Sequence, residues 1–160
     1  LPDASLSIQD RSGKPYVFDL FRKRYILLTP EEWVRQHFLR YLHEHKGYPA
    51  GLIAVEASLK YNRMARRADA IIYDSNGKPL MIIECKATHV TISQDVFDQV
   101  ARYNYPFGVS FLTVTNGLQH ICMLRDATAE QWVALKDIPN FKDINMLNPQ
   151  EIVNQFVNHG

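Results

Sequence analysis

Apolar residues recur along the chain in two patterns: helical spacing, which predicts helices, and short apolar runs, which predict strands. Residues 30–46 carry apolar side chains at helical spacing, with Thr29 and Pro30 before them and Gly47 after them, which predicts an amphipathic helix with defined ends. Residues 91–104 also carry apolar side chains at helical spacing, which predicts a second helix that ends before Pro106. Short apolar runs bounded by turn residues predict strands at residues 15–20, 24–28, 52–59, 68–74, 79–87, 108–115 and 118–125. A short third helix is expected at residues 148–158.

Two Asn-Gly pairs, Asn76-Gly77 and Asn116-Gly117, stand between apolar runs, and this is the strongest short signal for a β-hairpin. The predicted order is β-β-α-β-β-β-α-β-β-α, and the strand after the second helix is expected to run parallel to its predecessor through a right-handed crossover. The fold class is therefore α/β, with a mixed β-sheet flanked by helices. We expect a single domain over residues 1–160, with a core at 29–125, N-terminal strands at 1–28 and a C-terminal extension at 126–160.

Composition narrows the class of protein without identifying a partner. The chain has 18 Lys and Arg residues against 17 Asp and Glu, and its net charge of +1 gives no strong overall attraction to nucleic acid or membrane. No apolar run approaches the roughly 18 residues of a membrane span, and no signal peptide opens the sequence. Cys85 and Cys122 are too few for a disulfide framework or a four-thiolate zinc site. These features predict a cytoplasmic protein without membrane contact.

The first Asn-Gly hairpin brings two acidic residues together. If its turn has two residues, Ile71 faces Ile82 and Asp69 faces Glu84. Directly opposed residues have Cβ atoms about 4.5–5.5 Å apart on one face of the sheet. Lys86 lies two residues after Glu84 and therefore points to the same face. A bulge would break this register.

This trio is suited to chemistry on a phosphodiester. Like charges directly opposite each other destabilise a sheet, so a cation between Asp69 and Glu84 best explains the pair. Carboxylate oxygens suit Mg²⁺, with Mn²⁺ as a substitute, and the Lys86 ammonium can stabilise developing negative charge. The alternative is a solvated edge hairpin in which Lys86 is merely the ion-pair partner. Apolar residues on both faces of the two strands favour the metal site, because a buried strand should not end in uncompensated charge.

The string RADAIIYD, followed by NGKP and LMIIECKA, resembles the D…(D/E)xK signature of the PD-(D/E)xK nuclease superfamily, with Ala68 in place of the usual Pro. The segments TPEEWVRQHFLRYL, Gly47-Tyr48-Pro49 and VEASL resemble the N-terminal nuclease domain of type I restriction enzyme R subunits, and DQVARY is similar to its Q-x-x-x-Y element. The resemblance covers roughly residues 29–125. It implies a restriction-endonuclease-like αβββαβ core and a DNA endonuclease that depends on Mg²⁺.

The resemblance also assigns roles to single residues. Asp69, Glu84 and the main-chain carbonyl of Cys85 would ligate the metal, and Lys86 would be the catalytic lysine. Gln99 and Tyr103 lie at i and i+4 on the second helix and would support the site, although helix surface and core explain them as well. Glu32 could match an acidic residue on the first helix, but it is also explained by a capping box with Thr29, and Glu31 would compete for the role. Glu56 lies mid-strand and is either a further ligand or an ordinary outward-facing residue, and the second interpretation is favoured.

One basic cluster precedes Asp69, and it is a candidate contact surface for the DNA backbone. Its members are Lys60, Arg63, Arg66 and Arg67. The alternative is a solvated, flexible loop. Because the net charge is close to zero, the affinity of this domain for DNA is expected to be modest.

A P-loop is absent from the sequence, because both Gly-Lys pairs precede Pro rather than Ser or Thr. We therefore expect no ATP site, and either an excised nuclease domain or, as the favoured alternative, a standalone relative of the R subunit. Its expected partners are restriction-modification subunits or a separate motor protein. The competing hypotheses are an inactive nucleic-acid-binding or assembly module with the same fold, and a nuclease that acts on RNA. The intact Asp-Glu-Lys set favours an active enzyme.

Overall fold

The computed structural model describes residues 1, 5–126, 131–146 and 152 of the 160-residue chain. Within these residues the centre of the fold is a six-stranded mixed sheet in the order β11-β10-β9-β8-β7-β4, and only β8 and β9 are parallel neighbours. Its strands are β4 (Ile53–Val55), β7 (Ala70–Tyr73), β8 (Pro79–Cys85), β9 (Phe111–Thr115), β10 (His120–Asp126) and β11 (Gln131–Ala134). The predicted mixed α/β fold is confirmed, and so is the parallel strand after the second helix.

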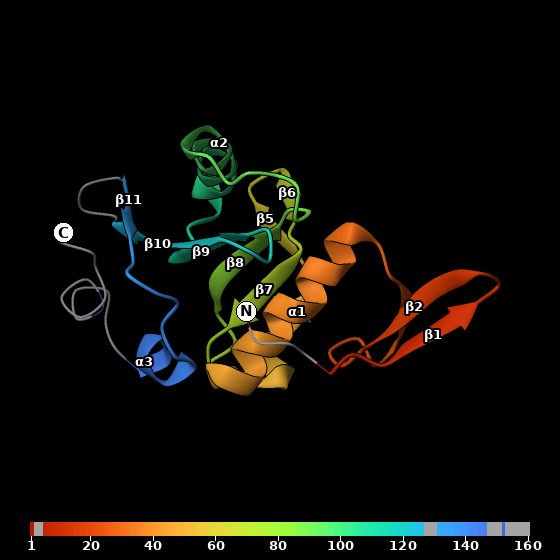
Figure 1. The fold of residues 1–160 in the computed structure, drawn as a ribbon. Coiled ribbons are helices and arrows are strands. Elements are labelled where there is room, and N and C mark those ends of the chain that lie inside the picture. Colours follow the sequence, from red (N-terminus) through yellow and green to blue (C-terminus); the bar gives the residue numbers. More distant parts are fainter. Residues whose placement is uncertain (2–4, 127–130, 147–151, 153–160) are drawn as a thin grey trace.

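Helices α1 (Pro30–His45) and α2 (Gln94–Asn104) pack on opposite faces of this sheet, and each closes one half of the core (Figure 1). Side chains of a strand alternate between the two faces, so Met81 packs with Phe38 of α1 whereas Ile82 packs with Phe97 of α2. All four are buried. Full burial of one such side chain contributes about 1.5–3 kcal/mol. The central strands are therefore held rigidly from both sides.

The ends of both helices follow from side-chain capping. The Thr29 hydroxyl accepts a hydrogen bond from the main-chain N–H of Glu32 at 3.1 Å, with Pro30 as the first helical residue, as predicted. The second helix begins at Gln94 rather than at residue 91, because Ser93 is its N-cap and accepts from the main-chain N–H of Val96 at 3.2 Å. The 3₁₀ turns η1 (Ala50–Leu52) and η2 (Tyr105–Phe107) follow the two helices.

The β7–β8 hairpin has the predicted register but not the predicted turn. Ile71 pairs with Ile82, as expected. The loop is longer than a two-residue Asn-Gly turn, however, because the main-chain N–H of Asp74 donates to the Lys78 carbonyl at 2.8 Å. A bulge in the ladder next to the loop absorbs the difference. The two deviations cancel, so the strand ends near Asp69 remain in register.

The predicted strand at 52–59 is split by a bend at Glu56. Its first part is β4 and its second part is β5 (Ser58–Tyr61), which pairs with β6 (Met64–Arg67). Glu56 has a φ of +52°, and its N–H donates to the Asp69 carbonyl at 3.0 Å, so antiparallel pairing continues through the bend. The basic cluster before Asp69 therefore lies on a β-hairpin rather than on a flexible loop.

The N-terminal residues form a separate three-stranded sheet of β1 (Ile8–Arg11), β2 (Lys14–Asp19) and β3 (Arg24–Leu27), which lies to one side of the main sheet (Figure 1). The strands predicted at residues 15–20 and 24–28 are confirmed as β2 and β3, whereas β1, β11 and α3 (Phe141–Met146) were not predicted. The helix expected at 148–158 lies outside the described residues, apart from Ile152. None of the helices in the described part has the length and apolar character to cross a membrane.

Candidate functional site

Asp69 and Glu84 lie side by side at the ends of two adjacent strands. Asp69 directly precedes β7, and Glu84 is next to the last residue of β8. The Oδ2 atom of Asp69 accepts a hydrogen bond from the main-chain N–H of Cys85 at 2.6 Å, and the negative charge of Asp69 is close enough to raise the pKa of Glu84. The structure thus brings the two predicted carboxylates together.

The surroundings of Glu84 favour its protonated form. The residue is only 6% exposed. Burial, followed by the negative charge of Asp69, raises the pKa of Glu84 to about 7, while the charges of Arg66 and Lys86 act in the opposite direction. A buried carboxyl group beside a second carboxylate behaves in this way, and a cation held by both would favour the ionised form.

Lys86 is the third residue of the predicted trio, and Cys85 carries the predicted main-chain ligand. The main-chain N–H of Lys86 donates to the Thr115 carbonyl at 2.8 Å, which fixes the end of β8 against β9. The Lys86 charge is close enough to lower the pKa of Glu84. Burial, followed by the charge of Asp69, raises the pKa of the Cys85 thiol well above its usual range. Since Mg²⁺ prefers oxygen ligands, Cys85 would offer such a cation its carbonyl rather than its thiol.

A network of charged side chains holds Asp69 from the side of α1. Glu32 is buried and accepts hydrogen bonds from Arg35 at 2.7 Å, Arg22 at 2.9 Å and Gln36 at 3.0 Å. Arg35 donates to the Asp69 carbonyl at 3.3 Å, and its Nη1 atom lies 3.9 Å from Asp69 Oδ1. The Glu32 carboxylate is therefore engaged with Arg35 beside Asp69, rather than with the capping-box partner considered above.

The charged groups of this network shift each other's pKa values. Burial alone would raise the pKa of Glu32, but hydrogen bonds from Arg35, Gln36 and Arg22 lower it below its ordinary value. Burial alone would lower the pKa of Arg35, but Glu32 and then Asp69 and Glu56 raise it. Both groups are therefore held in their charged forms.

Three further residues belong to this network. The buried carboxylate of Asp19 pairs with Arg22, and Glu56 lies 3.2 Å from Arg35 and 3.5 Å from Arg22. Glu56 also pairs with Arg67. The interpretation of Glu56 as an ordinary outward residue is thus wrong, because it joins β4 to α1 and to the N-terminal sheet. Arg22, Arg35 and Asp19 were not identified from the sequence, although Arg35 and Gln36 stand three and four residues after Glu32, the spacing at which helical side chains meet.

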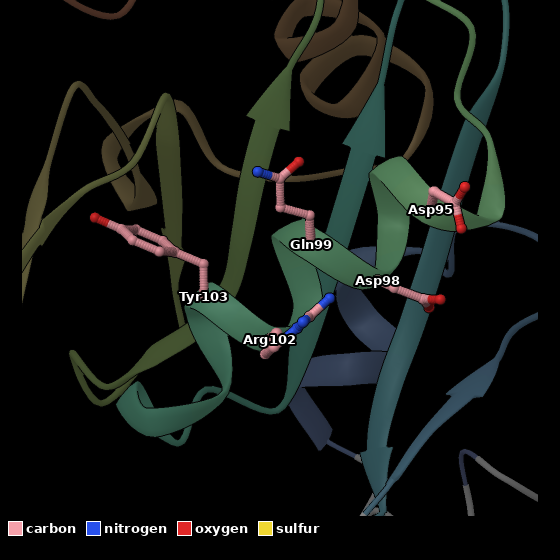
Figure 2. Close-up of a pocket in the computed structure, with 5 residues that line it drawn as sticks. All are labelled: Asp95, Asp98, Gln99, Arg102 and Tyr103. Carbon is pink, nitrogen blue, oxygen red and sulfur yellow. The ribbon is translucent and has the colours of Figure 1, made fainter.

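Gln99 and Tyr103 lie on α2 and line an open hollow of about 700 Å³ together with Asp95, Asp98 and Arg102 (Figure 2). Tyr103 is 59% exposed, so the alternative that it is a core residue is wrong. Its ring lies under the guanidinium of Arg66, whose carbon is 4.5 Å from the ring centre. The contact of Tyr103 with the carboxylates therefore runs through Arg66.

The basic residues predicted to bind DNA fall into two groups. Lys60 and Arg63 are exposed on the β5–β6 hairpin. Arg66 pairs with Glu84, and Arg67 pairs with Glu56. Two of the four side chains therefore neutralise acids of the candidate site, whereas the other two remain exposed to solvent.

The donor set fits a hard divalent cation that keeps part of its water shell. No three His, Cys, Asp or Glu side chains among the described residues gather as metal ligands. Mg²⁺ is usually bound through one or two carboxylates, with waters and substrate phosphates as its other ligands. Asp69, Glu84 and the Cys85 carbonyl match this description.

Comparison with known proteins identifies similar chains. The family model described as type I restriction enzyme R protein N terminus matches residues 30–139. A fragment of a protein assigned as an HsdR subunit of a type I restriction enzyme from Vibrio vulnificus YJ016 has a similar structure, with a TM-score of 0.53 at 20% identity. The match covers 73% of this chain and 24% of that one. The chain thus spans about a quarter of the length of that fragment.

A second solved structure is a protein assigned as a nuclease of DUF820 from Anabaena variabilis ATCC 29413. It matches with a TM-score of 0.48 at 11% identity, covering 96% of this chain and 93% of that chain. Comparison with curated proteins gives no significant match.

Proposed function

Because the chain belongs to the family of type I restriction enzyme R protein N-terminal domains, with a nuclease-like fold, we propose that it is a Mg²⁺-dependent endonuclease that hydrolyses phosphodiester bonds in DNA. The single observation that carries this proposal is the pairing of Asp69 with Glu84 at the ends of neighbouring strands, with Lys86 next to them. Two acids and one lysine in this arrangement suit metal-assisted attack of water on a phosphate.

Each residue has a distinct task in the proposed reaction. Asp69, Glu84 and the Cys85 carbonyl would hold the Mg²⁺, which supplies Lewis-acid activation of the phosphate and of the attacking water. The Lys86 ammonium would stabilise the negative charge that develops on the phosphate oxygens. These groups sit on strand ends fixed by packing on both faces, so little reorganisation is needed during the reaction.

Other residues would position the site or bind the substrate. Glu32 holds Arg35 against Asp69, and this fixes the direction of the Asp69 carboxylate. Gln99 and Tyr103 present a polar rim on α2, next to the hairpin that carries Lys60 and Arg63. We propose that the hairpin contacts the DNA backbone on either side of the phosphate that is cleaved.

The context of a restriction system suggests further partners. Restriction-modification subunits or a motor protein would deliver DNA to the site, in the cytoplasm, since the matching family is that of type I restriction enzyme R proteins. These partners are part of the proposal.

A plasmid-nicking assay tests the proposal directly. Protein stripped with EDTA should be inactive and should nick supercoiled DNA once Mg²⁺ or Mn²⁺ is added. Lys86→Ala should reduce the rate by about 10²–10³-fold, the usual cost of losing one group that stabilises transition-state charge. Lys78→Ala is the matched control, because Lys78 is an exposed lysine in the loop of the same hairpin. Undiminished cleavage by Lys86→Ala, or no cleavage by the parent with either metal, would overturn the assignment.

A further inference from the structure

Arg66 occupies an unusual position between the candidate metal site and α2. Its Nη2 atom pairs with Glu84 Oε1, and its guanidinium lies over the ring of Tyr103. The side chain comes from β6, in the basic hairpin, and is only 19% exposed. Arg66 therefore joins three elements around one carboxylate oxygen.

The pairing with Glu84 sets up a competition. A divalent cation held by Asp69 and Glu84 would need an oxygen of the same Glu84 carboxylate, and a guanidinium and a metal ion repel each other at that distance. Glu84 is buried, so the exchange of one positive partner for another takes place where charges are poorly screened. Arg66 and the metal therefore compete for the same Glu84 carboxylate.

A DNA phosphate is an alternative binding partner for Arg66. The Nε atom of Arg66 is buried without a hydrogen-bond acceptor among the described residues, so the contact with Glu84 leaves the guanidinium incompletely satisfied. The exposed cations Lys60 and Arg63 lie on the same hairpin, which would draw a DNA backbone toward it. A phosphate can accept two parallel hydrogen bonds from an arginine, which makes it a competitive partner for this side chain.

We infer that Arg66 is a positioning residue that couples metal loading to DNA binding: it pairs with Glu84 in free protein and transfers to a DNA phosphate when substrate binds, which leaves Glu84 to the metal. Tyr103 holds Arg66 at Glu84 through its ring. This inference rests on the proposed function, since it assumes a metal at Asp69 and Glu84. It goes further by making the metal affinity of the site depend on the substrate.

Calorimetric titration of Mn²⁺ into EDTA-stripped protein, without DNA, tests the competition. Arg66→Ala should bind Mn²⁺ on the order of tenfold more tightly than the parent, a typical size for a coupling between two sites. Arg67→Ala is the matched control, because Arg67 is the adjacent arginine and pairs with Glu56 instead. Its Mn²⁺ affinity should stay within about twofold of the parent, as its charge is well exposed to solvent.

Tyr103→Leu provides a test that does not change the charge. Loss of a cation–π contact of about 0.5–2 kcal/mol should raise Mn²⁺ affinity by about two- to thirtyfold. Because Tyr103 is largely exposed, this variant keeps the test available if Arg66→Ala does not fold.

The same titrations with a DNA duplex test the transfer, in a Lys86→Ala background that keeps the duplex intact. DNA should raise the Mn²⁺ affinity of this protein toward that of the Arg66→Ala variant, and it should add much less when Arg66 is already replaced. By reciprocity, Mn²⁺ should raise the DNA affinity of the protein with Arg66 by the same factor.

The outcomes separate the coupling from the proposed function. If the parent and Arg66→Ala bind Mn²⁺ equally, or if Arg67→Ala gains as much as Arg66→Ala, the coupling is overturned while the metal site stands. The coupling is also overturned if DNA raises the Mn²⁺ affinity equally in the proteins with and without Arg66. If neither protein binds Mn²⁺ with or without DNA, the metal site and the coupling are both wrong.

Discussion

Glu84 is the residue whose environment departs most from that of an ordinary acid. In the folded protein burial and Asp69 raise its pKa from 4.5 to about 7. Between these two values the native state binds a proton that the unfolded chain has lost, so the free energy of unfolding decreases as pH rises. The contribution of Glu84 is fully present below pH 4.5 and is lost as pH rises through about 7.

The predicted consequence is a pH dependence that one substitution removes. In EDTA, the parent should lose on the order of 3 kcal/mol of stability through this group between pH 4.5 and pH 8, since one pKa unit corresponds to 1.36 kcal/mol. Glu84→Gln keeps the shape but cannot ionise, so its stability should fall less over the same range. Urea unfolding of both proteins at several pH values measures the difference. Parallel curves for the two proteins would show that Glu84 does not titrate in this range.

Helix α1 contributes more to the site than its amphipathic pattern reveals. Its apolar positions predict its bounds almost to the residue, because Thr29 and Pro30 define the start and the packed face defines the length. The buried polar residues on the same helix, Glu32, Arg35 and Gln36, are stabilised through each other and through Arg22, and Arg35 also contacts Glu56 and the Asp69 carbonyl. Breaking such a network by removing one partner is costly, because the remaining charges stay buried.

This reasoning predicts a large difference between two adjacent glutamates. Glu32→Ala should lower the free energy of unfolding by about 3–5 kcal/mol, since it leaves Arg35 and Arg22 without their shared carboxylate. Glu31→Ala removes an exposed acid from the same first turn and should cost under about 1 kcal/mol. Chemical denaturation of the two variants measures both values. A similar small loss in each would mean that the network contributes little to stability.

Other elements show where local sequence signals stop being sufficient. The register of β7 with β8 could be predicted because apolar residues on both faces constrain it, even though the turn itself is longer than two residues. The pairing of β5 with β6 was missed because no Asn-Gly or apolar run marks it; its turn has Asn62 with a φ of +54° and its side chains are largely exposed. Strand β1 is exposed at every position, so it carries no hydrophobic pattern to detect.

At the scale of the whole molecule, the candidate site could be predicted only in its central part. Asp69, Glu84 and Lys86 lie on one hairpin, where spacing along the sequence reports proximity in space. The network that surrounds them joins the N-terminal sheet, α1 and β4, and these elements are brought together only by tertiary packing. The contact of Arg66 with Tyr103 likewise depends on how α2 packs beside the hairpin.

The thermal stability of the whole protein should report on the carboxylate pair without any substrate. Asp69 is repelled by Glu84, and it is attracted by Arg35, whose nearer partner is Glu32. Asp69→Asn removes the repulsion and keeps an oxygen that can accept the hydrogen bond from the Cys85 N–H. Above pH 7 in EDTA, where Glu84 is ionised, this change should raise the melting temperature by about 2–4 °C for a relief on the order of 1 kcal/mol. At pH 5, where Glu84 is largely neutral, the gain should disappear.

The same variant should lose the response to metal. A metal at 100 times its dissociation constant stabilises the native state by about 2.7 kcal/mol, so millimolar Mn²⁺ should raise the melting temperature of the parent. Asp69→Asn lacks one of the two charged ligands and should respond much less. Melts of both proteins with EDTA and with Mn²⁺ separate this from a simple ion pair of Asp69 with Arg35. If the ion pair alone explains Asp69, Asp69→Asn should have a lower melting temperature than the parent in EDTA. Mn²⁺ should then change the melting temperature of neither protein. That result would mean that Asp69 and Glu84 bind no metal until DNA supplies further ligands.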